Sequence, residues 1–194
     1  MRLKVMLALA VLVCGSMAAR AQMEMGPPKG APVGSKVNVA KALDEPLGLI
    51  EYQMMGVVKA MPADKYSFAP SSAAMPAARF DGVRTFVQQV THVAEANFYF
   101  YSSLSGLKPD VDMTKIEGIT NKDEAVAMLA KSFAFAHKAI ATITPENAFV
   151  AIKAVDGMDT RASLAAFGVA HGYDHYGQMV EYLRMNGVLP PGSK

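Results

Sequence analysis

Apolar residues recur at intervals of three and four along most of the chain, and this spacing is typical of amphipathic helices. The first such stripe runs over residues 39–61, with apolar side chains at Leu43, Leu47, Ile50, Met54 and Met61. Segments with similar spacing follow over residues 81–104 and 121–143, and a fourth begins at Asp159 or Thr160 and ends near residue 187. No segment between them reads convincingly as a strand. The pattern therefore predicts four long helices and no strand.

Capping residues support the boundaries of these helices. Asp81 is a good N-cap for the second helix, and Asn121 with Glu124 three residues later predicts a capping box at the start of the third. Gly187 follows the fourth helix, and two prolines after it prevent continuation. Pro46 lies within the first segment, where it either kinks the helix or marks its true first turn.

Four long helices without strands or repeats pack most simply as a four-helix bundle. We predict an all-α domain over residues 38–191, with an up-and-down arrangement in which the second and fourth helices run parallel. The preceding residues, 22–37, are rich in Pro and Gly and lack apolar periodicity. This composition predicts a disordered leader.

The first 21 residues have the pattern of a secretory signal peptide. Arg2 and Lys4 form a basic start, an apolar run covers residues 5–14, and Ala19 to Ala21 form an A-x-A cleavage site. The run is shorter than the ~20 residues that a membrane-spanning helix needs. We therefore predict an exported, periplasmic protein without stable membrane insertion after cleavage. An uncleaved anchor is the alternative.

Cleavage after Ala21 changes the composition. The chain has one cysteine, Cys14, which lies in the signal peptide, so the mature protein would have neither a disulfide nor a thiol. The 19 Lys and Arg residues would lose Arg2, Lys4 and Arg20 and fall to 16, against 17 Asp and Glu residues. A nearly neutral chain offers no electrostatic basis for binding nucleic acid or an anionic membrane.

Two of the four histidines, His171 and His175, lie four residues apart in the fourth predicted helix. Positions i and i+4 lie on one face of a helix. His92 lies 11 residues after Asp81, about as far into its helix as His171, so parallel helices would place both at one depth. Three converging imidazoles would form a metal site of the kind that bundles build from facing side chains. Two packed or surface histidines without a metal are the alternative.

Three neutral imidazoles without carboxylate or thiolate favour Zn, Ni, Cu or Fe(II) over Mg or Ca. Three protein ligands also leave positions open for water or substrate, as in catalytic zinc sites. His137, the fourth histidine, is interpreted as a solvated or half-buried helix residue. Asp174 points away from His175 and is interpreted as no ligand on the same face; the alternative is that it accepts a hydrogen bond from, and so orients, a histidine of another helix. Gln178 shares the histidines' face, where it either contacts a bound ligand or packs beside the site.

Separate segments of the chain resemble the DinB-like family, the DinB/YfiT superfamily. One is "YSFAPSSAAMPAARFDGVRTFVQQVTH", which ends at His92 and continues into "VTHVAEANFYF"; the other is "HGYDHYGQMVEYLRMNGVLPP", which holds the last two histidines. The resemblance covers about residues 40–190. It implies a four-helix bundle with one histidine on the second helix and an H-x-x-x-H pair on the last. By this resemblance, His92, His171 and His175 bind a divalent metal.

The resemblance implies zinc or nickel as the metal, with iron as a further candidate. Characterised members include transferases and isomerases that use low-molecular-weight thiols, which the metal activates as thiolates. Such thiols are chiefly cytosolic, so export speaks against this reaction. We expect a metal-dependent enzyme of the hydrolase or thiol-transferase type, acting on an unknown small molecule, and members of the family often form homodimers. The alternative is a metal-binding or interaction bundle without catalysis.

Overall fold

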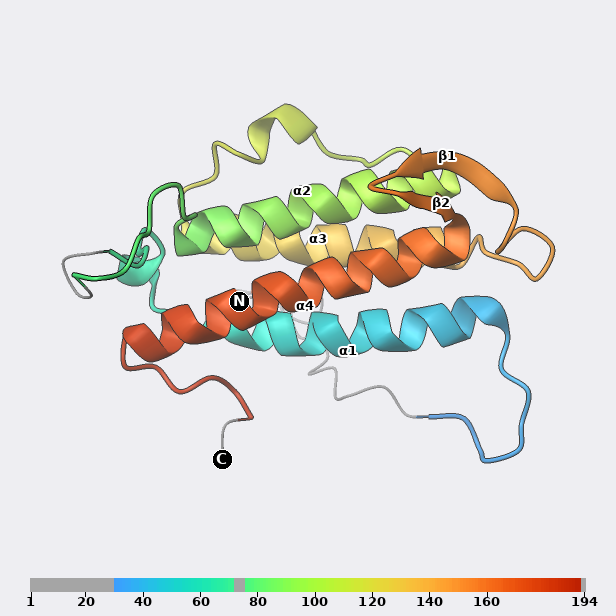
Figure 1. Ribbon diagram of the computed structural model, residues 1–194, viewed down its shortest axis with the longest axis horizontal. Coiled ribbons are helices and arrows are strands. Elements are labelled where there is room, and N and C mark those ends of the chain that lie inside the picture. The colour runs from blue at the N-terminus through green and yellow to red at the C-terminus, as the bar shows by residue number, and fades with distance from the viewer. Residues whose placement is uncertain (1–29, 72–75, 193–194) are drawn as a thin grey trace, which may run out of the picture.

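The structure is a computed structural model that describes residues 30–71 and 76–192. Its four long helices are α1 (Val39–Ala60), α2 (Phe86–Ser105), α3 (Lys122–Ile140) and α4 (Arg161–Met185). The connections contain two 3-10 helices, η1 (Ala63–Lys65) and η2 (Met113–Lys115), and two strands, β1 (Ala151–Val155) and β2 (Met158–Thr160). The predicted signal peptide and part of the predicted leader lie outside the described residues. The prediction of a four-helix bundle is confirmed (Figure 1).

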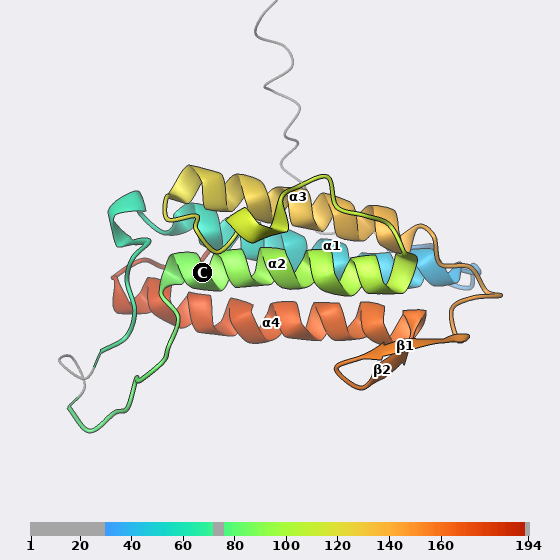
Figure 2. The same ribbon diagram turned by 90° about the horizontal axis from the view of Figure 1, so that it is seen from above.

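Helices α2 and α4 lie side by side and run in opposite directions (Figure 2). At one end, the hydroxyl of Tyr182 in the last turn of α4 donates to the carbonyl of Arg84, just before α2. At the other end, the hydroxyl of Tyr101 late in α2 donates to the carbonyl of Ala165 early in α4. The prediction that the second and fourth helices run parallel is therefore wrong.

The connection between α2 and α3 explains this difference. Lys122 at the start of α3 donates to the carbonyl of Met61 after α1, whereas His137 near the end of α3 contacts Asp44 near the start of α1, so these helices are antiparallel. Helices α1 and α4 run in the same direction (Figure 1). Since α2 and α3 are then parallel, residues 106–121 must return along the whole bundle (Figure 2). This return replaces the predicted up-and-down arrangement.

Local hydrogen bonds fix where the helices begin. Thr85, rather than the predicted Asp81, caps α2 and forms a capping box with Gln88. Asn121 caps α3 as predicted, with its side-chain oxygen 2.9 Å from the amide of Glu124, but the predicted capping box is incomplete, because the side chain of Glu124 makes no reciprocal bond to the backbone of Asn121. The first helix continues through Pro46 from residue 39 onward, so this proline does not mark its first turn.

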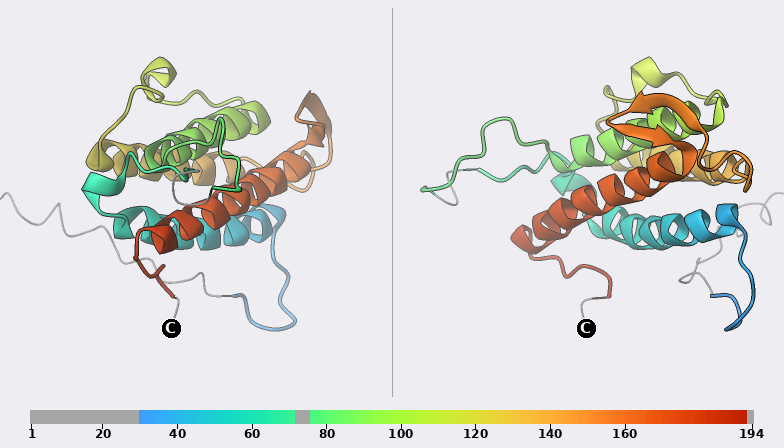
Figure 3. Two further views of the ribbon diagram at one scale, coloured as in Figure 1. Left: turned by 60° about the vertical axis from the view of Figure 1, so that its left-hand side comes forward. Right: turned by 45° about the vertical axis from the view of Figure 1, so that its right-hand side comes forward.

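The prediction that the chain contains no strand is also wrong. Strands β1 and β2 form an antiparallel hairpin that contacts the start of α4 and one face of α2 (Figure 3). Its turn contains Asp156 and Gly157, whose φ angles are 49° and 83°. A tight hairpin turn of type I′ needs positive φ at both positions, and Asp-Gly is a favoured pair there.

Apolar residues from all four helices fill the core, including Met54, Phe86, Tyr101, Phe133 and Leu183. Among the described residues, no helix is both long and apolar enough to span a membrane. Two glycines let α4 approach its neighbours closely. A Cβ atom at Gly168 would lie 2.8 Å from Oη of buried Tyr101, and one at Gly172 would lie 3.1 Å from Cγ1 of Ile50.

His137 of α3 lies between two carboxylates of α1. Its Nδ1 is 2.5 Å from Oδ1 of Asp44, and its Nε2 is 2.9 Å from Oε2 of the buried Glu51. Burial lowers the pKa of His137, but the hydrogen bonds to Glu51 and Asp44 outweigh this effect and raise the pKa above its ordinary value. Both ring nitrogens then donate, and the charged ring joins α3 to α1. The interpretation of His137 as a half-buried residue is confirmed.

We predict that Gly168→Ala destabilises the bundle, because the added methyl group must displace the ring of Tyr101. Overpacking of this kind costs about 1–3 kcal/mol, which outweighs the helix propensity that alanine gains. Gly177→Ala is a matched control in the same helix, because a Cβ there meets no atom within 4 Å. It should raise the free energy of unfolding by about 0.5–1 kcal/mol. Urea denaturation measures the free energy of unfolding of both variants. Equal changes in the two variants would contradict the close approach of α4 to Tyr101.

We also predict that His137→Gln lowers the free energy of unfolding most strongly at mildly acidic pH, by about 2 kcal/mol. The folded pKa of His137 is raised, so its contribution is fully present below the unfolded pKa near 6.5. The contribution is lost as the pH rises through the folded pKa. Denaturation of wild type and variant from about pH 5.5 to about pH 9 should show that the difference between their free energies of unfolding becomes smaller as the pH rises. A difference in the free energy of unfolding that does not change with pH would contradict a charged ring at His137.

Candidate metal centre

Helices α2 and α4 bring three imidazoles to one point. The Nε2 atom of His171 lies 3.2 Å from Nε2 of His92 and 3.2 Å from Nε2 of His175. One ligand atom from each of the three residues lies within 4.8 Å of the others. Two nitrogens bound at 2.0–2.1 Å to a tetrahedral zinc ion would lie about 3.3–3.4 Å apart. The three histidines could therefore hold a divalent metal ion.

The surroundings of the three rings favour the neutral imidazole. Burial lowers the pKa of His92 to about 4, with further contributions from the charges of Arg84 and His171. Burial, followed by the charges of the other two histidines, lowers the pKa of His175 to about 4. Burial also lowers the pKa of His171, although Asp174 opposes it. At neutral pH the rings are thus in the form that binds metals.

A buried glutamine that the sequence analysis missed orients His175. Gln89 is 1% exposed, and its Oε1 lies 2.7 Å from Nδ1 of His175. An amide oxygen only accepts, so Nδ1 carries the proton and Nε2 directs its lone pair toward the other two rings. The available signal was position, because Gln89 lies three residues before His92 and therefore on the same face of α2.

Of the other residues singled out in the sequence, Gln178 and Asp174 lie beside the three histidines, and His137 does not. Gln178 shares the face of the two histidines, as predicted, but it bonds to Gln89 at 2.8 Å. Asp174 is exposed, lies outside the three-histidine group and accepts from Gln178 at 3.0 Å. His137 lies away from this group, between α1 and α3.

An aromatic wall supports His171 from one side. The ring of Phe100 meets the imidazole of His171 edge-on, with centroids 5.3 Å apart and an interplanar angle of 85°. Phe100 in turn packs against Phe167 of α4. The Nδ1 atom of His171 is buried, and it has no hydrogen-bond partner among the described residues. Packing therefore orients this ring, whereas a hydrogen bond orients His175.

A polar cavity of about 490 Å³ opens beside His92. Its polar lining comes from the segment before α2, from the first half of α2 and from the return connection, and consists of Arg84, Gln88, Thr91, His92, Glu95 and Glu117. Glu95 follows His92 by three residues, is half-buried and forms no ion pair with another described residue. The cavity is large enough for a small polar molecule.

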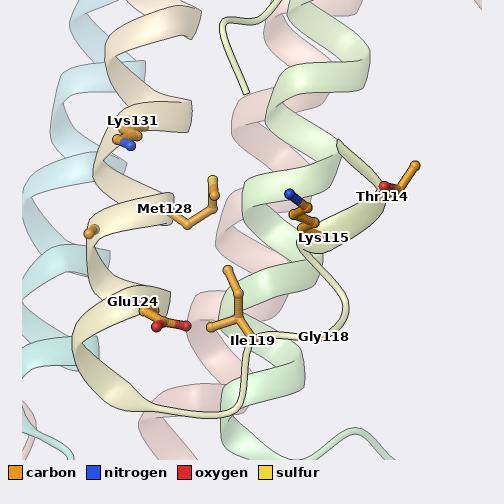
Figure 4. A pocket seen from close by; sticks show the side chains of 8 residues that line it. Thr114, Lys115, Gly118, Ile119, Glu124, Met128 and Lys131 are labelled. Atoms are coloured by element: carbon orange, nitrogen blue, oxygen red, sulfur yellow. The ribbon is translucent and has the colours of Figure 1, made fainter. Parts of the chain in front are cut away.

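A second cavity, of about 640 Å³, lies between α3 and the return connection and contains none of the three histidines. Figure 4 shows Met128 of α3 and Ile119 of the return connection among its lining residues, together with Lys115, Glu124 and Lys131. It is more apolar than the first cavity, and its lining offers a single carboxylate, that of Glu124, whereas a metal site needs several protein ligands. The cavity beside His92 is therefore the one that concerns the three-histidine site.

Comparison with known proteins assigns the chain to a family. The family model of the DinB superfamily matches residues 51–179, which is more than half of the chain and includes all three histidines. A search of curated proteins finds no match. The resemblance predicted from the histidine segments is thus confirmed, and the chain belongs to the DinB superfamily.

Proposed function

We propose that this protein is a metal-dependent enzyme in which His92, His171 and His175 hold a divalent transition metal. The observation that carries the proposal is the convergence of three half-buried or buried imidazoles, with Nε2 of His171 at 3.2 Å from Nε2 of each of the other two and one ligand atom of each within 4.8 Å of the others. Imidazole ligands suit zinc, nickel and iron(II). We expect zinc or nickel first, with iron as a further candidate.

A divalent metal with three protein ligands supplies Lewis acidity, which activates water or a thiol as a nucleophile near neutral pH. The protein's own residues would bind the substrate and move protons. Arg84 offers a positive charge in the lining of the polar cavity, and Glu95 and Glu117 offer carboxylates. Carboxylates in such a cavity are suited to general acid and base roles. A polar small molecule fits this lining, and the reaction is of the hydrolase or thiol-transferase type.

We further propose that the enzyme acts in the periplasm after removal of residues 1–21. The basic start, the short apolar run and the A-x-A site support this proposal. Because low-molecular-weight thiols are chiefly cytosolic, this location favours hydrolysis over thiol transfer. A homodimer remains a prediction from the resemblance, and nucleic acid is not an expected partner of the nearly neutral mature chain.

The proposal predicts about one equivalent of zinc, nickel or iron in the mature protein purified without a histidine tag. His171→Ala should weaken metal binding by more than about 100-fold, since it removes a metal ligand itself and not a residue that hydrogen-bonds to a ligand. His137→Ala is the matched control and should keep the metal, because His137 lies between α1 and α3. Elemental mass spectrometry measures the metal content. Absence of metal after adding back all three metals would contradict the proposal.

A second experiment separates an enzyme from a metal-binding bundle without catalysis. Cobalt(II) replaces the metal, and its visible absorption is recorded before and after the addition of azide. A spectral change indicates an exchangeable position, which an enzyme of this type needs. An unchanged spectrum would indicate a saturated site and favour the non-catalytic alternative.

A further inference from the structure

We propose that Asp174, Gln178 and Gln89 form a hydrogen-bonded relay that determines which nitrogen of His175 carries the proton. The three are positioning residues, because they act on the metal through His175. The inference rests on the proposed metal site. It explains how the bundle fixes the protonated nitrogen of one metal ligand, His175, before the metal binds. We name this set of three side chains the orienting relay.

The orienting relay runs from the surface to the buried face between α2 and α4. Oδ2 of the exposed Asp174 accepts from Nε2 of Gln178 at 3.0 Å. Oε1 of Gln178 accepts from Nε2 of Gln89 at 2.8 Å. Oε1 of Gln89 lies 2.7 Å from Nδ1 of His175. Each link is within normal hydrogen-bond distance, and the last two are shielded by the burial of Gln89.

The carboxylate of Asp174 fixes the orientation of the amide groups of Gln178 and Gln89. An ionised carboxylate can only accept, so Gln178 must turn its NH₂ group toward Asp174. The oxygen of Gln178 then faces α2, and Gln89 must turn its own NH₂ group toward it. The oxygen of Gln89 is left for His175, whose Nδ1 must therefore be the protonated nitrogen. Nε2 of His175 is then an unprotonated ligand atom aimed at the other two histidines.

A preset proton position matters because only one tautomer of His175 presents a free Nε2 atom. When the binding-competent form is a fraction of the population, the apparent affinity falls by that fraction. An acceptor on the far nitrogen also raises the basicity of a ligating imidazole. His171 lacks such an acceptor among the described residues, since its Nδ1 has no partner there. His175 is thus the ring whose orientation is built in by hydrogen bonding.

Three variants test the orienting relay. Gln89→Leu removes the acceptor of His175 and should weaken zinc binding about 10- to 100-fold, the range typical of residues behind metal ligands. Asp174→Asn lets the amide of Gln178 turn either way and should weaken zinc binding about tenfold. Glu181→Gln removes the same charge from an exposed position of α4 and should bind zinc like the wild type. Competition with a chromophoric chelator measures each affinity.

The proton position is measured separately, by ¹⁵N NMR of the histidine rings in the metal-free protein. Wild-type His175 should show a protonated Nδ1, and Asp174→Asn should shift part of the population to a protonated Nε2. Adding Gln89→Glu to Asp174→Asn should restore the wild-type proton position. In that double variant the carboxylate introduced at position 89 can only accept, and the amide introduced at position 174 can donate to the oxygen of Gln178.

The outcomes distinguish the relay from a simple charge effect. A loss of zinc affinity in Asp174→Asn without a change in the tautomer of His175 would assign the effect to charge and overturn the relay. Unchanged affinity and tautomer in Asp174→Asn, an exposed substitution that should leave the fold intact, would overturn it as well. If the wild type binds no zinc, nickel or iron, the proposed function fails, whereas the tautomer in the metal-free protein still decides about the relay.

Discussion

The antiparallel contact between α2 and α4 is the constraint on which the site depends. It is fixed at one end where Tyr182 donates to the carbonyl of Arg84, and at the other where α4 approaches Tyr101 through Gly168. Between these ends, the bond between Gln89 and Gln178 holds the two helices in register. Imidazole side chains are too short to reach a common point across helices that are further apart. The close packing of α4 is therefore a requirement of the site as well as of the core.

The convergence of the three histidines was predicted from parallel helices, although the helices are antiparallel. The prediction succeeded because His171 and His175 lie on either side of the midpoint of α4, which covers residues 161–185. Reversing a helix about its midpoint hardly changes the depth of residues near that midpoint. Helical periodicity does not encode direction. The relative direction of α2 and α4 depends on how residues 106–121 return along the bundle. This path is set by tertiary packing, and no local sequence pattern predicts it.

Other differences between prediction and structure concern features for which the sequence does contain a local signal. The Asp156-Gly157 pair is a strong hairpin signal, yet the strands around it are short, and only β1 has a buried residue. Thr85 and Gln88 form a capping box that fits the start of α2 better than Asp81, because it supplies two reciprocal bonds. Gln89 had the right spacing from His92. Its role depends on contact with α4, and a single helix cannot reveal such a contact.

The four histidines of the chain show how environment assigns opposite tasks to one residue type. His137 lies between two carboxylates, which raise its pKa and favour the charged ring that joins α1 to α3. His92 and His175 lie among other imidazoles and near Arg84, and burial, the largest effect on the pKa of either ring, favours the neutral form. Asp174 opposes this effect at His175, but its carboxylate accepts a hydrogen bond from Gln178 instead of from a ring. The carboxylate of Asp174 thus orients His175 through two intervening amides and without a hydrogen bond to the ring, while burial keeps the pKa of His175 at about 4 and the ligand neutral.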